Sequence, residues 1–190
     1  MFEAAHQLQR RFDALATAGD EKGMGETGRC VRDQIIGECF GRLAGLGAVV
    51  ALTADHGMND KSDAAGKPNV IWLQDILDAT FGKGDTRAIC PITDAFVGHH
   101  GALGGFVRVW SRGAVTARQI IDAIGDAEGV ELALDRDTAC RLFDMPPDRE
   151  GDVAVIAHEH WCIGSSAKNH DLSGLKGHRL RTHGGTSETK

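Results

Sequence analysis

Apolar residues recur at helical spacing in several separate parts of the chain. In residues 32–45, for example, Ile35, Ile36, Cys39 and Leu43 fall on one face, and glycines follow the last of them. A stripe of apolar positions three or four residues apart is typical of an amphipathic helix. By this pattern we predict helices over residues 2–17, 32–45, 68–81, 115–127 and 137–143.

A second pattern is the short apolar run without helical spacing, and its clearest example is residues 48–54. Valine, leucine and alanine follow one another there without alternation, which is typical of a strand covered on both faces, as in a parallel α/β sheet. We also predict strands over residues 87–91, 105–110, 130–134 and 152–157. The strand at 48–54, the helix after it and the strand at 87–91 are expected to form one right-handed crossover unit.

These elements predict an α/β fold in which a mostly parallel sheet is flanked by helices. The strands and helices of residues 105–160 resemble half of a split βαβ layer, so we expect them to form a small inserted α+β subdomain. Residues 31–104 then form part of the main core, and residues 161–190 return to it. Residues 1–30 are a predicted helix and loop that we assign to neither part.

Composition and charge narrow the class of protein. The chain has 190 residues, of which 42% are hydrophobic and 25% charged, as is usual for one globular domain. Its formal net charge of −6 argues against nucleic acid or an anionic membrane as the main partner. A small anionic substrate would need local cations, which a bound metal can supply.

The cysteines and the first residues of the chain indicate the cellular compartment in which the protein is expected. Five cysteines are scattered without C-x-x-C spacing: Cys30, Cys39, Cys90, Cys140 and Cys162. An odd, scattered set argues against a disulfide framework and a thiolate zinc site, and favours thiols in a reducing compartment. The first residues lack the apolar segment of a signal peptide, and no run approaches the ~20 apolar residues of a membrane helix. We therefore predict a cytoplasmic protein.

Candidate chemistry follows the apolar run directly, at Asp55 and His56. Ligands bind at the carboxyl ends of strands in such sheets, and a carboxylate oxygen beside an imidazole suits zinc. The alternative is a simple polar turn after a buried strand. A second tract, residues 181–188, presents His183 followed by two glycines. Two such tracts, far apart in sequence, can meet at one sheet edge.

Several motifs, in order along the chain, resemble the phosphonoacetate hydrolases of the alkaline phosphatase superfamily. The residues from Thr53 to Met58, TADHGM, resemble the strand-end metal motif of that superfamily. The other matching stretches are Pro68–Asp75, Pro91–Asp94, His99–Gly104, His170–Leu175 and Thr182–Gly185 with Ser187 and Glu188. The resemblance runs from about Gly41 to Glu188, and residues 1–30 carry none of it.

This resemblance implies an alkaline-phosphatase-like fold and a two-zinc hydrolase that cleaves the carbon–phosphorus bond of phosphonoacetate, giving acetate and phosphate. In that family a threonine attacks phosphorus, and the two metals lie ~3.5–4 Å apart. By the resemblance, Asp55 and His56 bind the metal that also binds the nucleophile. His183 is a ligand of the other metal.

The chain also departs from the family pattern. The family carries its threonine nucleophile and an aspartate ligand ahead of the Asp-His-Gly motif, and an aspartate and a histidine that hold the second metal. No residue before Asp55 matches them, so we expect a fragment that lacks the N-terminal part, with three metal ligands and no catalytic residue of its own. We predict weak or no zinc retention by this chain alone. An unpaired apolar sheet edge would then invite association, as a homodimer or with a companion chain.

Other residues and other functions stay open. Asp60, Lys61 and Asp63 are expected to form a solvated loop, with binding of a substrate anion by Lys61 as the alternative. His158 and His160 are expected at the surface or a subdomain interface rather than on a metal. The alternative functions are a phosphodiesterase or nucleotide pyrophosphatase of the same superfamily, and a non-catalytic remnant.

Overall fold

The computed structural model describes residues 26–51, 53, 55–92, 103–170, 172–175 and 179–187. The chain divides into two compact units, residues 1–53 and 54–190, and each is described by itself. The helix predicted at 2–17 lies outside the described residues, as do Thr93, Asp94, His99 and His100. No helix in the described ranges is long and apolar enough to span a membrane.

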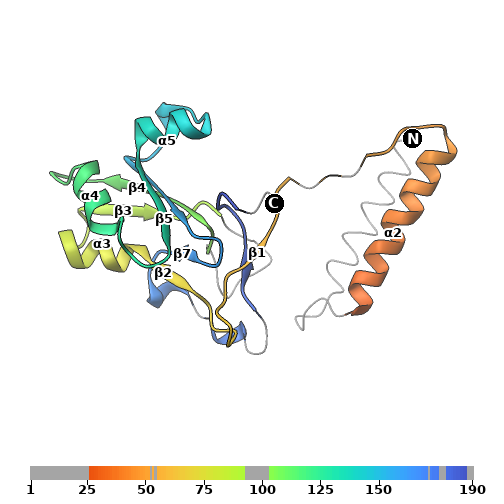
Figure 1. Ribbon diagram of the computed structural model, residues 1–190, viewed down its shortest axis with the longest axis horizontal. Coiled ribbons are helices and arrows are strands. Elements are labelled where there is room, and N and C mark those ends of the chain that lie inside the picture. The colour runs from red at the N-terminus through yellow and green to blue at the C-terminus, as the bar shows by residue number, and fades with distance from the viewer. Residues whose placement is uncertain are drawn as a thin grey trace. The chain divides into compact units, whose positions relative to one another are not determined.

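The described part of the first unit is built on one helix, α2, Glu26–Gly45 (Figure 1). The helix confirms the one predicted at 32–45 and begins six residues earlier. Gly47 has a φ of +75°, which glycine adopts at little cost. The amide of Gly47 donates to Ala44 O and that of Ala48 to Leu43 O. This pair of bonds is the Schellman motif that ends helices, so the predicted glycine stop is confirmed.

The strand predicted at 48–54 is wrong for this structure. Residues 48–51 have no regular secondary structure, and Val49 is fully exposed, at 100%. A strand needs neighbouring backbone to receive its N–H and C=O groups, and no described strand pairs with this run. The predicted right-handed crossover unit is therefore wrong too, since it depended on this strand.

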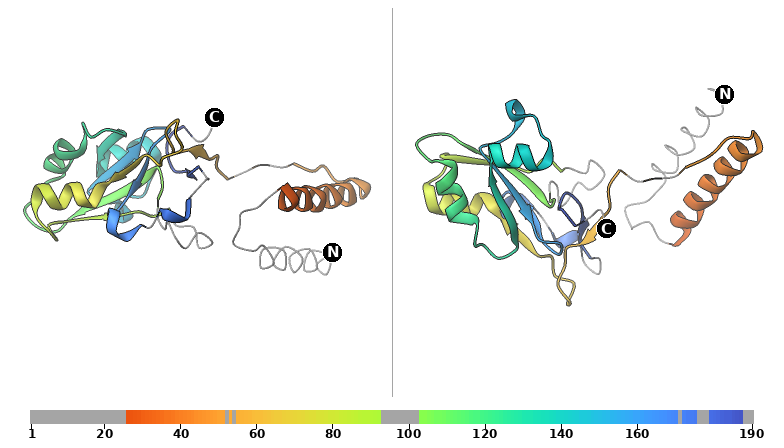
Figure 2. Two further views of the ribbon diagram at one scale, coloured as in Figure 1. Left: turned by 90° about the horizontal axis from the view of Figure 1, so that it is seen from below. Right: turned by 45° about the horizontal axis from the view of Figure 1, so that its top comes forward.

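The second unit is a mixed α/β body with short strands and three helices among its described residues (Figures 1 and 2). Its first elements are β1 Asn59–Asp60, β2 Val70–Trp72, α3 Leu73–Phe81, β3 Thr86–Ile89, β4 Phe106–Ser111, α4 Ala117–Ile124 and β5 Val130–Asp135. They are followed by α5 Arg136–Phe143, a 3-10 turn Pro147–Arg149, β6 Val153–Ala157, β7 Cys162–Gly164, the 3-10 turns Ala167–Asn169 and Ser173–Leu175, and β8 Arg181–Thr182.

The largest sheet has four strands in the order β3-β4-β6-β5, and all its pairings are antiparallel. Because β4 and β5 both run antiparallel to β6, which lies between them, they run parallel to each other with one strand inserted. This is the split βαβ arrangement that the sequence predicted for 105–160. The sheet also takes in β3, which lies ahead of that range. The predicted domain boundaries stay a prediction.

The core lies on one face of this sheet. All five residues of β6 are buried, and its alternate residues Val153 and Val155 pack in one apolar cluster with Val107 and Val109 of β4. The same cluster contains side chains of two helices, namely Leu73 and Leu77 of α3 with Ile120 and Ile124 of α4. Alternation on the strands and helical spacing on α3 and α4 therefore meet in one core.

A two-stranded parallel sheet joins β2 to β7, with Val70 opposite Cys162 and Trp72 opposite Gly164. The helix predicted from residue 68 therefore begins only at Leu73, and its expected first turn is a strand. The β-branched and aromatic residues of β2 favour a strand, and β7, which was not predicted, supplies its partner. The mixed α/β class is confirmed, although β2–β7 is the only parallel pair among the described strands.

Candidate metal centre

Strands β1 and β8 form the scaffold of the candidate site. They pair antiparallel, with Asn59 opposite Thr182 and Asp60 opposite Arg181. In an antiparallel pair, the residues that precede one strand lie alongside those that follow the other. The register brings the residues just before β1 alongside the tract that contains His183, and the ring contact between His56 and His183 joins the two tracts.

The two imidazole rings are in contact. Their centroids lie 3.6 Å apart, and the ring planes differ by 11°. The Nδ1 atom of His56 lies 3.0 Å from Gly57 O, and its Nε2 lies 3.6 Å from Oδ1 of Asp55. Asp55 is 89% exposed and His56 39% exposed on their side chains. The structure thus brings together the three residues that the sequence singled out.

The geometry of Asp55 and His56 fits two positions of a zinc site. Bonds of about 2.0–2.2 Å in tetrahedral zinc put neighbouring ligand atoms roughly 3.3–3.6 Å apart, close to the 3.6 Å between Asp55 Oδ1 and His56 Nε2. With Nδ1 of His56 donating to Gly57 O, a contact assigned from geometry, Nε2 is left as the metal-binding atom. The donor types and spacing therefore fit zinc.

The number of donors falls short of a full site. In the part of the chain that the structure describes, no group of three or more His, Cys, Asp or Glu side chains could hold a metal ion. A catalytic zinc ion takes three protein ligands and an open position. The assignment of Asp55, His56 and His183 as metal ligands stays a prediction.

The backbone around His183 is fixed by hydrogen bonds to the strand region after residue 102. Gly105 N donates to His183 O at 2.7 Å, and the buried hydroxyl of Thr182 donates to Leu103 O at 2.7 Å. A Cβ built on Gly105 would lie 2.5 Å from Gly185 N, a distance that backbone atoms cannot accept. Gly105 is therefore required for this close approach.

Side-chain hydrogen bonds also hold the end of the tract that contains His183. Thr186 Oγ1 lies 3.0 Å from both carboxylate oxygens of Glu131 on β5, and Asn59 Nδ2 donates to Ser187 Oγ at 3.1 Å. The sequence carried no signal for these contacts, because they join segments far apart in the chain. They hold the His183 tract against both β1 and the four-stranded sheet.

Asp60 of β1 and Lys61, which follows it, are held by contacts with other parts of the unit. Asp60 forms a hydrogen-bonded ion pair with Arg179, and that hydrogen bond lowers the pKa of the Asp60 carboxyl, with the charge of Arg179 adding to it. Lys61 is fully buried, and its Nζ donates to Glu159 O at 2.7 Å. The expected solvated loop is therefore wrong at Lys61, because burial and this bond fix its ammonium inside the unit.

The remaining candidate histidines are His158, His160 and His170. His158 and His160 are exposed, as predicted, and His160 Nδ1 lies 3.1 Å from Asp60 O. His170 stacks on Trp72 with centroids 5.4 Å apart and lies 3.2 Å from Ser165 Oγ. Asp171 lies outside the described residues.

Two of the thiols are poorly suited to ligate a metal. Burial raises the pKa of the Cys162 thiol to about 12 and that of Cys90 to about 11. Metals and electrophiles react with the thiolate, so a neutral buried thiol is inert. Cys39, Cys90, Cys140 and Cys162 are free.

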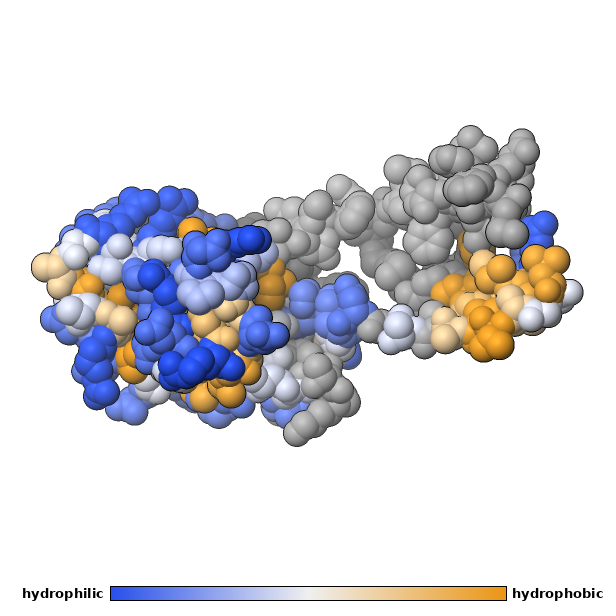
Figure 3. Space-filling model, turned by 90° about the horizontal axis from the view of Figure 1, so that it is seen from above, coloured by the Kyte–Doolittle hydropathy of each residue, from blue (hydrophilic) through white to orange (hydrophobic). Residues whose placement is uncertain are grey.

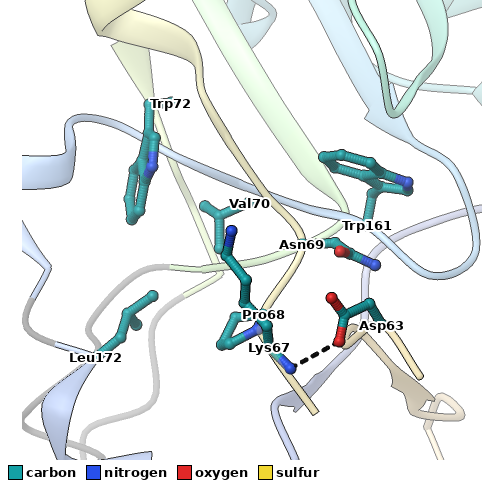
Figure 4. Close-up of a pocket in the computed structure, with 8 residues that line it drawn as sticks. All are labelled: Asp63, Lys67, Pro68, Asn69, Val70, Trp72, Trp161 and Leu172. Carbon is teal, nitrogen blue, oxygen red and sulfur yellow. Dashed lines mark hydrogen bonds between the residues drawn. The ribbon is translucent and has the colours of Figure 1, made fainter. Parts of the chain in front are cut away.

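An open hollow of about 470 Å³ lies at β2. Its walls include Trp72 and Trp161, with Lys67 and Asp63 at one side (Figure 4). The lining residues are Asp63, Lys67, Pro68, Asn69, Val70, Trp72, Trp161 and Leu172. None of the three predicted metal ligands lines it, so the hollow is separate from the candidate site.

The chain is a mixed α/β protein whose fold matches that of phosphonoacetate hydrolase. No family model matches the chain. The chain is 41% identical to a solved structure of phosphonoacetate hydrolase from Sinorhizobium meliloti 1021 in complex with phosphonoformate, with a TM-score of 0.73. A second structure of that enzyme, in complex with phosphonoacetate, matches with the same identity and TM-score. The matches cover 82% of this chain and 37% of the solved chain.

The matched part of the chain is similar to phosphonoacetate hydrolases, which confirms the resemblance predicted from the motifs. It spans well under half the length of the solved enzyme, at 37%.

Proposed function

We propose that this chain supplies part of the active site of a hydrolase that cleaves the carbon–phosphorus bond of phosphonoacetate to acetate and phosphate. The observation that carries the proposal is the stack of His56 on His183, with centroids 3.6 Å apart, in a chain 41% identical to a phosphonoacetate hydrolase. Each histidine lies in one of the two tracts that resemble the family's metal motifs.

The proposed site holds two zinc ions. Asp55 and His56 would bind one ion, and His183 would bind the other. The contact of the two rings supports this division, because ligands of two ions that lie roughly 3.5–4 Å apart must themselves lie close together. When bound, zinc supplies positive charge that stabilises the oxygens of the phosphoryl group. The chain itself orients the imidazole of His56 through Gly57 O and holds the backbone of His183 through the Gly105 amide.

Charge considerations support a metal-held substrate. Phosphonoacetate is a small anion, and the chain has a formal net charge of −6, so local cations are needed to attract it. The ammonium of Lys61 is buried against Glu159 O, and we propose no substrate contact for it. The four cysteines whose side chains the structure describes are free, which supports a reducing compartment, the cytoplasm.

The remaining ligands and the threonine nucleophile are proposed to come from polypeptide outside this chain. The match to 37% of the solved enzyme supports this. The second candidate is a chain that performs no chemistry by itself, which is favoured by the lack of a group of three metal-binding side chains among the described residues.

The experiment is a phosphonoacetate hydrolysis assay on this chain joined to the unmatched remainder of the Sinorhizobium meliloti enzyme, with zinc supplied. We expect phosphate release that is lost in His183→Ala and retained in His158→Ala, an exposed histidine away from the stack. A nitrophenyl phosphodiester assayed in parallel distinguishes a phosphodiesterase. Phosphate release unchanged by His183→Ala would contradict the proposed site.

A further inference from the structure

The four-stranded sheet of the second unit has two edge strands, β3 and β5. An edge strand carries backbone N–H and C=O groups that point away from the sheet, and these groups can pair with a further strand. On the face drawn in Figure 3, the described residues of this unit are largely hydrophilic, with apolar residues in small areas between them. A contact with a partner there would depend on hydrogen bonds and charge, which the two edges offer to different degrees.

The outward backbone groups of β3 are occupied by a side chain of α3. The Ala88 amide donates to Oε1 of Gln74 at 2.7 Å, and Nε2 of Gln74 donates to Thr86 O at 3.3 Å. The same Nε2 lies 2.7 Å from Oδ1 of Asp78, one turn further along the helix. Gln74 therefore makes the two bonds that a neighbouring strand would make, and it blocks this edge.

The other edge strand, β5, has outward backbone groups at Ala133. The Arg136 amide donates to Asp152 O, so Arg136 faces β6. Because alternate residues of an antiparallel strand face its partner, Leu134 also faces β6 and Ala133 faces away from it. Among the described residues, no loop backbone and no side chain bonds the N–H or C=O of Ala133. This edge can therefore accept another strand.

A groove of about 390 Å³ lies along the open edge. One wall is formed by α4 and the turn after it, including Ile121, Asp122 and Asp126, and the other by residues 131–134 of β5 (Figure 1). Some protein domains bind an extended peptide as an added strand at such a sheet edge. Backbone bonds then supply affinity, and the neighbouring side chains supply specificity.

The charge of the groove indicates the chemistry of its occupant. The lining carries three carboxylates, Asp122, Asp126 and Glu131, and one cation, Arg118. Arg118 Nε lies 2.9 Å from Asp122 Oδ1, so the cation is paired within the groove wall. The groove is therefore negative overall and favours a basic partner.

A second copy of the chain is a poor occupant of this edge. Two-fold antiparallel pairing of β5 with itself about Ala133 sets Glu131 of one copy opposite Asp135 of the other, and it does so twice. Like charges directly opposite on neighbouring strands destabilise their pairing. Each copy also has a formal net charge of −6, which opposes association.

We propose that the groove between α4 and β5 binds an extended basic segment of a partner protein as a fifth, antiparallel strand of the sheet. The central residue of that segment exchanges both backbone bonds with Ala133. Lysine or arginine two residues to either side of it meets Glu131 and Asp135. These carboxylates already accept from the hydroxyls of Thr186 and Thr138, and a carboxylate has room for further donors.

The test uses the full chain and a blocked seven-residue peptide, Thr-Lys-Val-Val-Val-Lys-Thr, with two control peptides. One control has glutamate in place of both lysines, and the other carries an N-methyl group on the central valine. We expect the lysine peptide to bind and to slow hydrogen exchange at the Ala133 amide. Exchange at the Ala88 amide, which is bonded to Gln74, should not change. Both control peptides should bind at least roughly tenfold more weakly, because one lacks the charge and the other the backbone donor.

A pair of charge reversals tests where the peptide lies. Asp126→Lys changes an exposed residue of the groove lining and should weaken binding of the lysine peptide about tenfold. The matched control, Asp148→Lys, changes an exposed residue of the 3-10 turn outside the lining and should leave the affinity unchanged.

Several results would overturn the proposal. They are no binding of the lysine peptide, equal binding of either control peptide, and equal affinity of the two variants. Slow exchange at the Ala133 amide without peptide would also overturn it, because the edge would then be occupied by this chain or by a second copy. Light scattering of the chain alone separates those two cases.

Discussion

His56 and His183 stack face to face, with ring centroids 3.6 Å apart, although they lie near opposite ends of the second unit's sequence. The antiparallel pairing of β1 and β8 brings the two segments together, and the hydrogen bonds of Thr182 and Gly105 hold the segment that contains His183. Geometry that is set by backbone pairing rather than by long side chains is well suited to hold imidazoles for a metal.

The close approach at Gly105 predicts a large effect of one methyl group. In Gly105→Ala the new Cβ would lie 2.5 Å from Gly185 N, so the His183 tract must move. We expect a loss of about 1–3 kcal/mol in the free energy of unfolding and loss of the His56–His183 contact in NMR spectra. Gly113→Ala is the control, because its Cβ meets nothing within 4 Å. Equal stability of the two variants would contradict the packing described.

Two buried threonines predict opposite outcomes for the same substitution. Thr182→Val removes the bond to Leu103 O and should cost about 1–3 kcal/mol, since a buried acceptor loses its donor. Thr86 is also buried, and its Oγ1 has no hydrogen-bond partner among the described residues. Thr86→Val should therefore be neutral or stabilising. Urea unfolding of both variants measures the difference, and a cost at Thr86 as large as that at Thr182 would refute it.

The ion pair between Arg108 and Glu150 predicts that substitutions at these two residues have strongly coupled effects on stability. Arg108 Nε lies 2.7 Å from Glu150 Oε1, and the Glu150 side chain is only 1% exposed. Arg108→Met would leave that carboxylate buried without its cation and should cost about 3–5 kcal/mol. Adding Glu150→Leu should restore most of the stability. A double variant that is no more stable than Arg108→Met would show that the pair is not coupled in this way.

The Asp60–Arg179 pair predicts an acid-sensitive contact. The hydrogen bond from Arg179 lowers the pKa of Asp60 below its ordinary value of 3.8. A carboxyl with a lowered pKa in the folded state stabilises the fold fully above the ordinary value, and this contribution is lost as the pH falls through the folded pKa. NMR titration of the Asp60 carboxyl should show the low pKa, and Arg179→Met should return it towards 3.8. An unchanged pKa in that variant would contradict the assigned cause.

Much of the second unit could be predicted from local pattern. The helices at 117–124 and 136–143 and the strands at 106–111, 130–135 and 153–157 follow apolar spacing, because each buries apolar side chains within the unit. Residues 70–72 and 162–164 were not predicted as strands. Each run is only three residues long, and each is defined by its pairing with the other, which no single stretch of sequence reveals.

The candidate metal ligands could be predicted from the sequence, but the contacts that hold them in place could not. Asp55, His56 and His183 were found from motifs, since metal-binding residue types at a strand end are a local signal. The buried Lys61 and the contact of Thr186 with Glu131 depend on distant segments, so polarity alone suggested a solvated loop. The strand at 48–54 was predicted from a two-sided apolar pattern, and the described chain holds no partner strand to form it with.

The most direct test of the metal site is a zinc titration of this chain followed by the imidazole signals of its histidines. We predict that His56 and His183 shift first, with weak affinity because the ligand set is incomplete, while His158 and His160 respond only at higher zinc concentrations. Signals of His56 and His183 that stay unmoved, or that move no earlier than those of the exposed histidines, would contradict the assignment of these residues to a metal centre.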